Sequence, residues 1–93
     1  MVVTELAKNK IEELIKGPKE VMPEHIFFLR ITAIEDNGIK YQTYFDYETR
    51  LDDTLFRFRQ FDLRIDPESL KYLAQAILDF NEENGFVLDQ INQ

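Results

Sequence analysis

The sequence predicts a small α+β domain with the element order α-β-β-β-α. In this arrangement a three-stranded antiparallel meander carries two helices packed on one face, and the C-terminal tail docks on the domain. Two observations predict it: apolar residues recur at helical spacing near both ends of the chain and alternate between the ends. The length of 93 residues, with 44% apolar and 31% charged residues, suits a single globular domain spanning residues 1–93.

The first helix is expected over residues 4–16. Thr4 is a suitable N-cap because its hydroxyl can accept a hydrogen bond from a free backbone N–H. Gly17 and Pro18 are expected to end the helix, since glycine accepts a left-handed conformation and proline cannot continue the hydrogen-bond ladder. The apolar stripe consists of Val3, Ala7, Ile11, Leu14 and Ile15.

A second helix is expected over residues 67–84. Asp66 is its predicted N-cap, Pro67 occupies the first helical position, and Gly85 is the predicted residue that ends it. Its apolar stripe consists of Leu70, Leu73, Ala74, Ile77 and Phe80.

Three strands are expected between the helices, over residues 25–35, 39–48 and 54–65. A three-residue turn ending at Gly38 gives the first hairpin one apolar face, whereas a two-residue turn would mix polar and apolar side chains. The three-residue turn pairs Ala33 with Tyr41, Ile31 with Thr43, Leu29 with Phe45 and Phe27 with Tyr47.

The third strand has a conflict of parity. Phe56 and Phe58 share one face of an extended chain, whereas Phe61, Leu63 and Ile65 share the other. Because a regular strand cannot bury both sets, the sequence predicts a bulge or bend near residues 59–60. The apolar tail after Gly85 has three alternatives, which are to extend the sheet edge, to pack on the first helix or to meet a second copy.

The residue types argue against an enzyme, a metal site and a cofactor. Without cysteine there is no disulfide, thiolate metal site or thiol nucleophile, and the single histidine His25 cannot make a zinc site alone. Nothing brings His25 and the single serine Ser69 together as a catalytic pair. No signal peptide and no apolar stretch of membrane-spanning length is visible, so we expect a cytoplasmic protein with no membrane partner.

The net charge of −7 is distributed unevenly, with an acidic C-terminal third. The leading interpretation is a small acidic, non-enzymatic protein-binding module that inhibits a protein partner by occupying its basic, nucleic-acid-binding groove as a DNA mimic. Four carboxylates of the second helix and the tail are the expected contacts: Asp79, Glu82, Glu83 and Asp89.

The alternative is a nucleic-acid-binding domain that uses an open sheet face. Arginines beside an aromatic ring can hold phosphates and stack bases, and the candidates are Arg30, Tyr44, Arg57 and Arg59. The element order resembles that of double-stranded-RNA-binding domains. In that family a lysine cluster opens the second helix, whereas residues 66–71 here hold one lysine and two acids, so no family is assigned. A net charge of −7 also opposes direct binding of a polyanion.

A third surface could serve self-association, and the sequence leaves monomer and homodimer both open. Its apolar residues are Phe86, Val87, Leu88 and Ile91.

Overall fold

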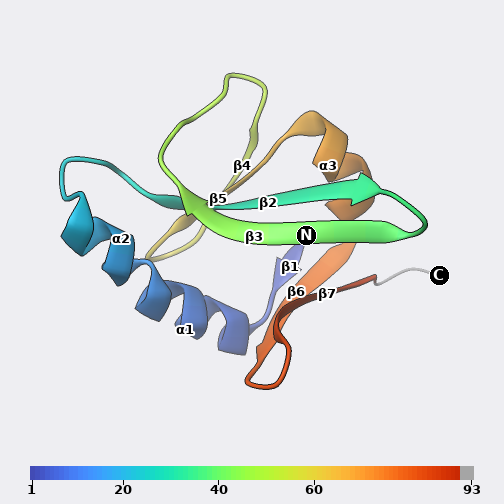
Figure 1. Cartoon of the computed structure of the whole chain (residues 1–93), viewed down its shortest axis with the longest axis horizontal. Helices are drawn as coiled ribbons and strands as arrows, with labels where there is room; N and C mark the ends of the chain where they lie inside the picture. Colours follow the sequence, from blue (N-terminus) through green and yellow to red (C-terminus); the bar gives the residue numbers. More distant parts are fainter. Residues whose placement is uncertain (91–93) are drawn as a thin grey trace.

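The chain folds into two small β-sheets with helices packed against them (Figure 1). The computed structural model describes residues 1–90, so the predicted role of Ile91 lies outside the described residues. The two sheets and the helices confirm the predicted α+β class. In chain order the elements are β1 (Val2–Val3), α1 (Glu5–Leu14), α2 (Lys16–Val21), β2 (Phe28–Glu35), β3 (Ile39–Asp46), β4 (Thr54–Arg57), β5 (Asp62–Ile65), α3 (Pro67–Leu73), β6 (Ala76–Asn81) and β7 (Gly85–Gln90).

Both sheets are mixed, and the predicted antiparallel meander is wrong. The larger sheet has the order β3-β2-β5-β4, in which β2 and β5 are parallel and the other two pairs are antiparallel. The smaller sheet has the order β1-β6-β7, with β1 parallel to β6 and β6 antiparallel to β7.

The predicted third strand is in fact a hairpin, which resolves its conflict of parity. The chain reverses between β4 and β5, where the backbone N–H of Phe58 donates to the carbonyl of Phe61 at 3.0 Å. After the reversal Phe56 pairs directly with Leu63, so these two side chains point to the same side of the sheet. A bend was predicted at this place, but a complete reversal was not.

The register of the β2–β3 hairpin is confirmed for three of the four predicted pairs, from Ala33 with Tyr41 to Leu29 with Phe45. Gly38 has the positive φ (115°) expected of the last residue of a three-residue turn, and Asn37 before it also has a positive φ (57°). The fourth pair lies beyond the strands, although the rings of Phe27 and Tyr47 meet edge to face at 5.5 Å.

The first helix begins as predicted but does not stop at Gly17 and Pro18. The hydroxyl of Thr4 accepts a hydrogen bond from the N–H of Ala7 at 3.2 Å. At Ile15 the backbone stays right-handed (φ −65°, ψ −19°), and α2 follows at once. Pro18 lies in the first turn of α2, where its missing N–H costs little.

The second predicted helix is half right. Asp66 caps α3 and Pro67 opens it, but the helix ends at Leu73, and residues 76–81 form β6. Burial in β6 alternates from buried Ala76 to buried Leu78, and both flanking strands pair with it. Gly85 is left-handed as predicted (φ 74°), but it starts β7 after a turn and does not end a helix.

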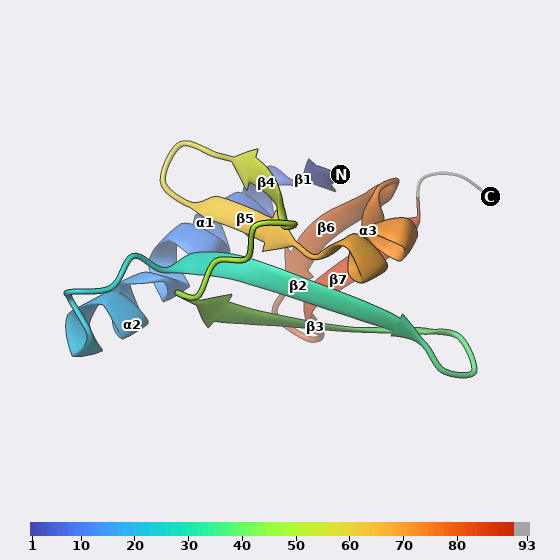
Figure 2. The same ribbon diagram turned by 90° about the horizontal axis from the view of Figure 1, so that it is seen from above.

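The hydrophobic core joins the two sheets and the helices. Its fully buried members include Ile11 of α1, Ile31 of β2 and Leu78 of β6. α1 packs on β6 and α3 packs on β2, so the predicted placement of both helices on one face of one sheet is wrong. Figure 2 shows β3 at the outer boundary of the molecule. Within residues 1–90 no helix is long and apolar enough to cross a membrane.

Candidate functional site

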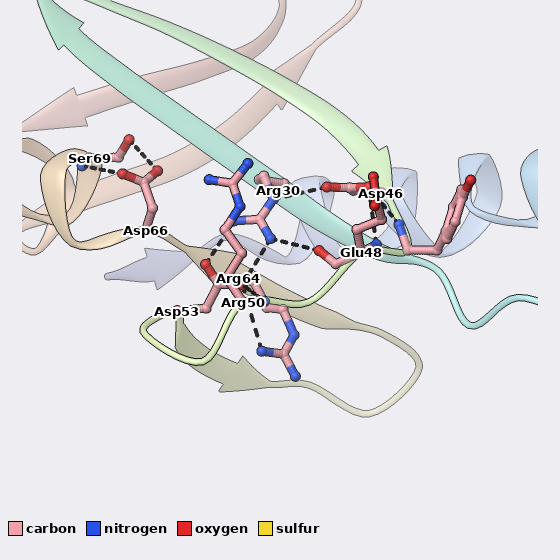
Figure 3. Close-up of polar contacts among 9 residues, drawn as sticks. Arg30, Asp46, Glu48, Arg50, Asp53, Arg64, Asp66 and Ser69 are labelled. Carbon is pink, nitrogen blue, oxygen red and sulfur yellow. Dashed lines mark hydrogen bonds and ion pairs between the residues drawn. The ribbon is translucent and has the colours of Figure 1, made fainter.

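A buried arginine cluster lies where the loop between β3 and β4 covers the larger sheet (Figure 3). Arg30 of β2 is fully buried. Its Nη1 and Nη2 donate to the two carboxylate oxygens of Asp53 at 2.9 and 2.8 Å, and its Nε donates to Asp46 at 3.1 Å. Nη2 also donates to the carbonyl of Glu48 at 3.1 Å. One guanidinium therefore fixes both the start and the end of the loop.

A second arginine and an aromatic ring complete this cluster. Arg64 of β5 lies beside Arg30 in the sheet and places its Nη1 3.7 Å from Asp53. The guanidinium carbons of Arg30 and Arg64 lie 5.2 and 5.4 Å from the centre of the Phe28 ring. The cluster consists of Phe28, Arg30, Asp46, Asp53 and Arg64, and its two positive and two negative charges balance.

The electrostatics of the cluster hold all its groups charged. The hydrogen bond from Arg30 lowers the pKa of Asp53 below its usual range, against the opposing effect of burial. Burial raises the pKa of Asp46, but the backbone N–H groups of Glu48 and Tyr47, together with Arg30, outweigh it and lower that pKa on balance. The carboxylates in turn raise the pKa of Arg30, with Asp53 the largest contributor.

The cluster holds the fold together, and its buried polar atoms are all paired within the protein. Among residues 1–90, no buried side-chain nitrogen or oxygen lacks a hydrogen-bond partner. Arg30 therefore cannot take part in the nucleic-acid surface that the sequence predicted, because the loop covers it. Asp53 is the residue that the sequence reasoning missed. The signal available in the sequence was Arg30 itself, because an arginine that becomes buried in a strand requires a carboxylate partner nearby.

The other three residues predicted for the sheet face do not form one surface. Tyr44 lies on β3 and Arg57 on β4, which are the opposite edges of the larger sheet. Arg59 lies in the turn between β4 and β5. The structure therefore separates Tyr44 from the two exposed arginines.

The four predicted acidic contacts lie on the β6–β7 hairpin and not on a helix. Glu82 and Glu83 are exposed in its turn, and Asp89 is exposed on β7. Asp79 accepts hydrogen bonds from the hydroxyl of Thr4 at 2.7 Å and from the N–H of Phe80 at 2.8 Å. The Thr4 hydroxyl lowers the pKa of this carboxyl. Asp79 thus fastens α1 to β6.

The tail residues predicted for self-association form β7. Phe86 meets the ring of Phe80 at 5.1 Å, and both Phe86 and Leu88 pack against the core. The N–H of Leu88 donates to the hydroxyl of Tyr41 at 3.1 Å, which joins the two sheets. Val87 is half-buried. Extension of a sheet edge is therefore the alternative that the structure supports for residues 85–90.

The histidine and the serine of the described part of the chain have separate structural surroundings. His25 stacks on Tyr47 at 4.0 Å, and Ser69 is buried against Ala33 and Asp66. His25 precedes β2, whereas Ser69 bonds to Ala33 near the other end of that strand, so the two residues lie apart in the fold. Among the described residues, no group of three or more histidine, cysteine, aspartate or glutamate side chains could hold a metal ion.

Comparison with known proteins gives the chain a family context. It is 35% identical over 81 residues to the iron-sulfur cluster insertion protein ErpA of Wigglesworthia glossinidia brevipalpis, which covers 87% of this chain and 69% of that protein. No protein-family model matches the sequence.

Two solved structures share the fold. Escherichia coli SufA, described as involved in the biosynthesis of iron-sulfur clusters, superposes with a TM-score of 0.77 at 20% identity, over 99% of this chain and 82% of that chain. IscA with its 2Fe-2S cluster gives a TM-score of 0.75 at 20% identity, over 98% of this chain and 85% of that chain.

These findings overturn the predicted function and partner. The interpretation as an acidic DNA mimic that inhibits a basic nucleic-acid-binding protein is wrong, because the relatives are iron-sulfur cluster insertion proteins. The nucleic-acid-binding alternative is also wrong, and Arg30, one of its four candidate residues, is buried. A net charge of −7 favours solubility by itself and does not require an acidic binding surface.

Proposed function

This chain belongs to the family of iron-sulfur cluster insertion proteins that includes ErpA, and from that membership we propose that it takes part in iron-sulfur cluster insertion. The observation that carries the proposal is the sequence relation, which extends over 87% of the chain. The likeness of the fold to SufA and IscA supports it. The relatives are named for the insertion of a cluster and not for a catalysed reaction, which agrees with a non-enzymatic role.

The chemistry of a cluster restricts this role. Iron-sulfur clusters are held by cysteine thiolates, with histidine as an occasional replacement. These 93 residues contain no cysteine and one histidine, and His25 stacks on a tyrosine ring. The residues present therefore do not fit a cluster as a bound group. The cluster is the cargo of the process, and its thiolate ligands must come from another chain or segment.

The role that remains is one of protein contact. Insertion of a cluster requires a protein that receives it. Because this chain lacks cysteine ligands, it would act by binding a protein that carries them. The exposed carboxylates of the β6–β7 hairpin, Glu82, Glu83 and Asp89, stay our predicted contact surface for such a protein. The cytoplasmic location also stays a prediction.

A transfer assay tests this function. A cysteine-bearing family member is loaded with cluster under anaerobic conditions and mixed with an apo-ferredoxin, with and without this chain. We expect the chain to bind one of the two proteins and to change the transfer rate, followed by the visible absorbance of the ferredoxin. No binding to either protein together with an unchanged rate would exclude the proposed function.

A reconstitution experiment tests the restriction separately. The chain alone is incubated anaerobically with ferrous iron and sulfide and then desalted. We expect no bound iron or sulfide and no thiolate-to-iron absorbance, whereas the cysteine-bearing family member treated in parallel gains both. A stoichiometric cluster on this chain alone would show that it is a carrier in its own right, with ligands other than thiolates.

A further inference from the structure

Two hairpin turns of the chain contain the same kind of tripeptide, an acidic residue followed by asparagine and glycine. Residues 36–38 form the whole turn between β2 and β3, whereas residues 83–85 end the turn between β6 and β7. Both asparagines, Asn37 and Asn84, are exposed. In an asparagine–glycine sequence the backbone nitrogen of the glycine can attack the side-chain amide, because no Cβ atom obstructs its approach. The fold decides which of the two sites can react.

The backbone nitrogen of Gly38 is free to react. Gly38 lies between the strands, and its carbonyl accepts a hydrogen bond from the N–H of Asp36 at 2.8 Å. Its own N–H, like the side-chain amide of Asn37, has no hydrogen-bond partner among residues 1–90. Residues 34–40 are all exposed, and in Figure 2 this turn projects beyond the sheet. The surroundings therefore leave this nitrogen open to attack the amide of Asn37.

The backbone nitrogen of Gly85 is held in the β6–β7 ladder. The N–H of Thr4 donates to the carbonyl of Leu78 at 2.9 Å, so Leu78 directs its backbone groups toward β1 and away from its partner Leu88. The Leu78–Leu88 pair is therefore not hydrogen-bonded, and pairs along an antiparallel ladder alternate. Three positions later, Asn81–Gly85 is a hydrogen-bonded pair, in which the N–H of Gly85 donates to the carbonyl of Asn81.

We propose that Asn37 is a site of spontaneous deamidation in the folded chain and that the β6–β7 ladder protects Asn84. The nitrogen of Gly38 forms a bond to Cγ of Asn37, and the bond from Cγ to the amide nitrogen breaks. The amide nitrogen takes up the proton of the Gly38 N–H and leaves as ammonia. Water then opens the cyclic imide at either carbonyl, which gives aspartate or isoaspartate. The reaction consumes water and needs no oxidant or reductant.

The modification changes the tip of the β2–β3 hairpin in two ways. It adds a negative charge beside Asp36, whose carboxylate pairs with Lys40 at 3.4 Å, and makes the net charge one unit more negative than −7. The isoaspartate product also routes the backbone through the side chain, which adds a methylene group to a turn whose length sets the strand register. The aged chain therefore differs from the new one in charge and shape at this exposed tip.

Peptide mapping measures both sites in one sample. The folded chain is kept at mildly alkaline pH for days, and samples are cleaved with trypsin and analysed by mass spectrometry. Cleavage after Arg30 and Lys40 isolates residues 31–40, in which Asn37 is the only side-chain amide. We expect Asn37 to convert about tenfold or more faster than Asn84, because attack at Asn84 first requires rupture of a backbone hydrogen bond. Similar rates, faster conversion of Asn84 or an unchanged Asn37 would overturn the proposal.

The same chain unfolded in guanidinium chloride is the matched control. Asn37 and Asn84 each follow an acidic residue and precede a glycine, so the unfolded chain offers the same local chemistry at both sites. We expect the two rates to become similar in the denaturant, since the ladder no longer holds Gly85. A preference for Asn37 that persists in the unfolded chain would show that the local sequence causes it, and would overturn the protective role of the ladder.

The products identify the attacking atom. Attack by the nitrogen of Gly38 gives isoaspartate as well as aspartate at position 37, and synthetic peptides of residues 31–40 with either product serve as chromatographic standards. Aspartate alone would indicate direct hydrolysis by water and would overturn the proposed reaction. Asn37→Gln requires a larger ring that closes more slowly, so it should abolish the product at position 37 and leave the rate at Asn84 unchanged. Circular dichroism checks that this variant is folded, and a product formed at the wild-type rate would contradict the proposed ring closure.

Discussion

Arg30 and Asp53 form a bidentate ion pair whose two side chains are both completely shielded from solvent. The pair joins a central strand to a loop 23 residues later in the chain. Two parallel hydrogen bonds join the guanidinium to the carboxylate, and Asp46 and the carbonyl of Glu48 accept two more of its N–H groups. The buried ion pair therefore holds the loop between β3 and β4, together with the ring of Tyr47, which packs on Phe27.

Removal of one partner of this pair should cost more than most single substitutions. Asp53→Ala leaves the positive charge of Arg30 buried with one carboxylate fewer, and we expect a loss of about 3–5 kcal/mol in the free energy of unfolding. Urea unfolding followed by circular dichroism measures it. Arg59→Ala, in the exposed turn between β4 and β5, should change stability by less than about 0.5 kcal/mol. Similar losses for the two variants would contradict this account of the cluster.

The same cluster predicts how stability depends on pH. The pKa values of Asp53 and Asp46 are lowered in the folded chain, while the unfolded carboxyls titrate near about 3.9. Their contribution is therefore complete above that pH and is lost as the pH falls through the folded pKa values. Urea unfolding at several pH values between about 6 and 2 should show this decline.

A pair of carboxyl substitutions tests the source of that decline. Asp46→Asn keeps the bidentate pair but removes one contributor, so the fall in stability below about pH 4 should become shallower. Glu68→Gln alters an exposed carboxyl and should leave the slope as in the wild type. An unchanged slope for Asp46→Asn would assign the acid sensitivity to other carboxylates.

Ser69 should be important for the stability of the fold. Its hydroxyl accepts from the buried N–H of Ala33 and donates to Asp66 at 2.7 Å, which joins α3 to β2. Ser69→Ala leaves this N–H unpaired, and we expect a loss of about 1–3 kcal/mol in the free energy of unfolding. Glu68→Ala, one position earlier and exposed, is the control and should cost little. A loss below about 0.5 kcal/mol for Ser69→Ala would mean that water replaces the hydroxyl.

Two glycines should respond in opposite directions to alanine. Gly38 has a φ of 115°, which alanine resists, so Gly38→Ala should lower stability by about 1 kcal/mol or more. Gly17 lies in α2 with open space around the position of a Cβ atom, so Gly17→Ala should raise stability by roughly 0.5–1 kcal/mol. Thermal unfolding of both variants beside the wild type gives the two signs. Destabilisation by Gly17→Ala would contradict the helical conformation of residue 17.

The sequence predicts local elements with local causes well. The cap at Thr4, the start of α3 at Asp66 and Pro67, and the β2–β3 register each depend on residues a few positions apart. The predicted end of the second helix is wrong because residues 76–80 satisfy both periods. Ile77 and Phe80 continue the helical stripe, whereas Ala76, Leu78 and Phe80 alternate as in a strand. Pairing with β1, 75 residues earlier, decides in favour of the strand.

The candidate site failed for a related reason. The sequence places Arg30 on the non-core face of β2, and that much is correct, but nothing in the sequence shows that a loop returns to cover it. The sequence alone does not identify Asp53 as the partner of Arg30, because the two residues are 23 positions apart. The proposed function depends on the sequence relation, because this chain contains no cysteine, the residue that would indicate cluster binding.

The parallel pair of β1 and β6 has a consequence for how the protein forms during synthesis. Val2 and Val3 can pair only with Ile77 and Leu78, and the N–H of Thr4 donates to the carbonyl of Leu78. These contacts cannot form before residues 77 and 78 have been synthesised. Contacts so distant in sequence require closure of a long loop and form slowly. On a ribosome, the larger sheet can assemble while β1 is still unpaired. The smaller sheet can form only after β6, near the end of the domain, has left the exit tunnel.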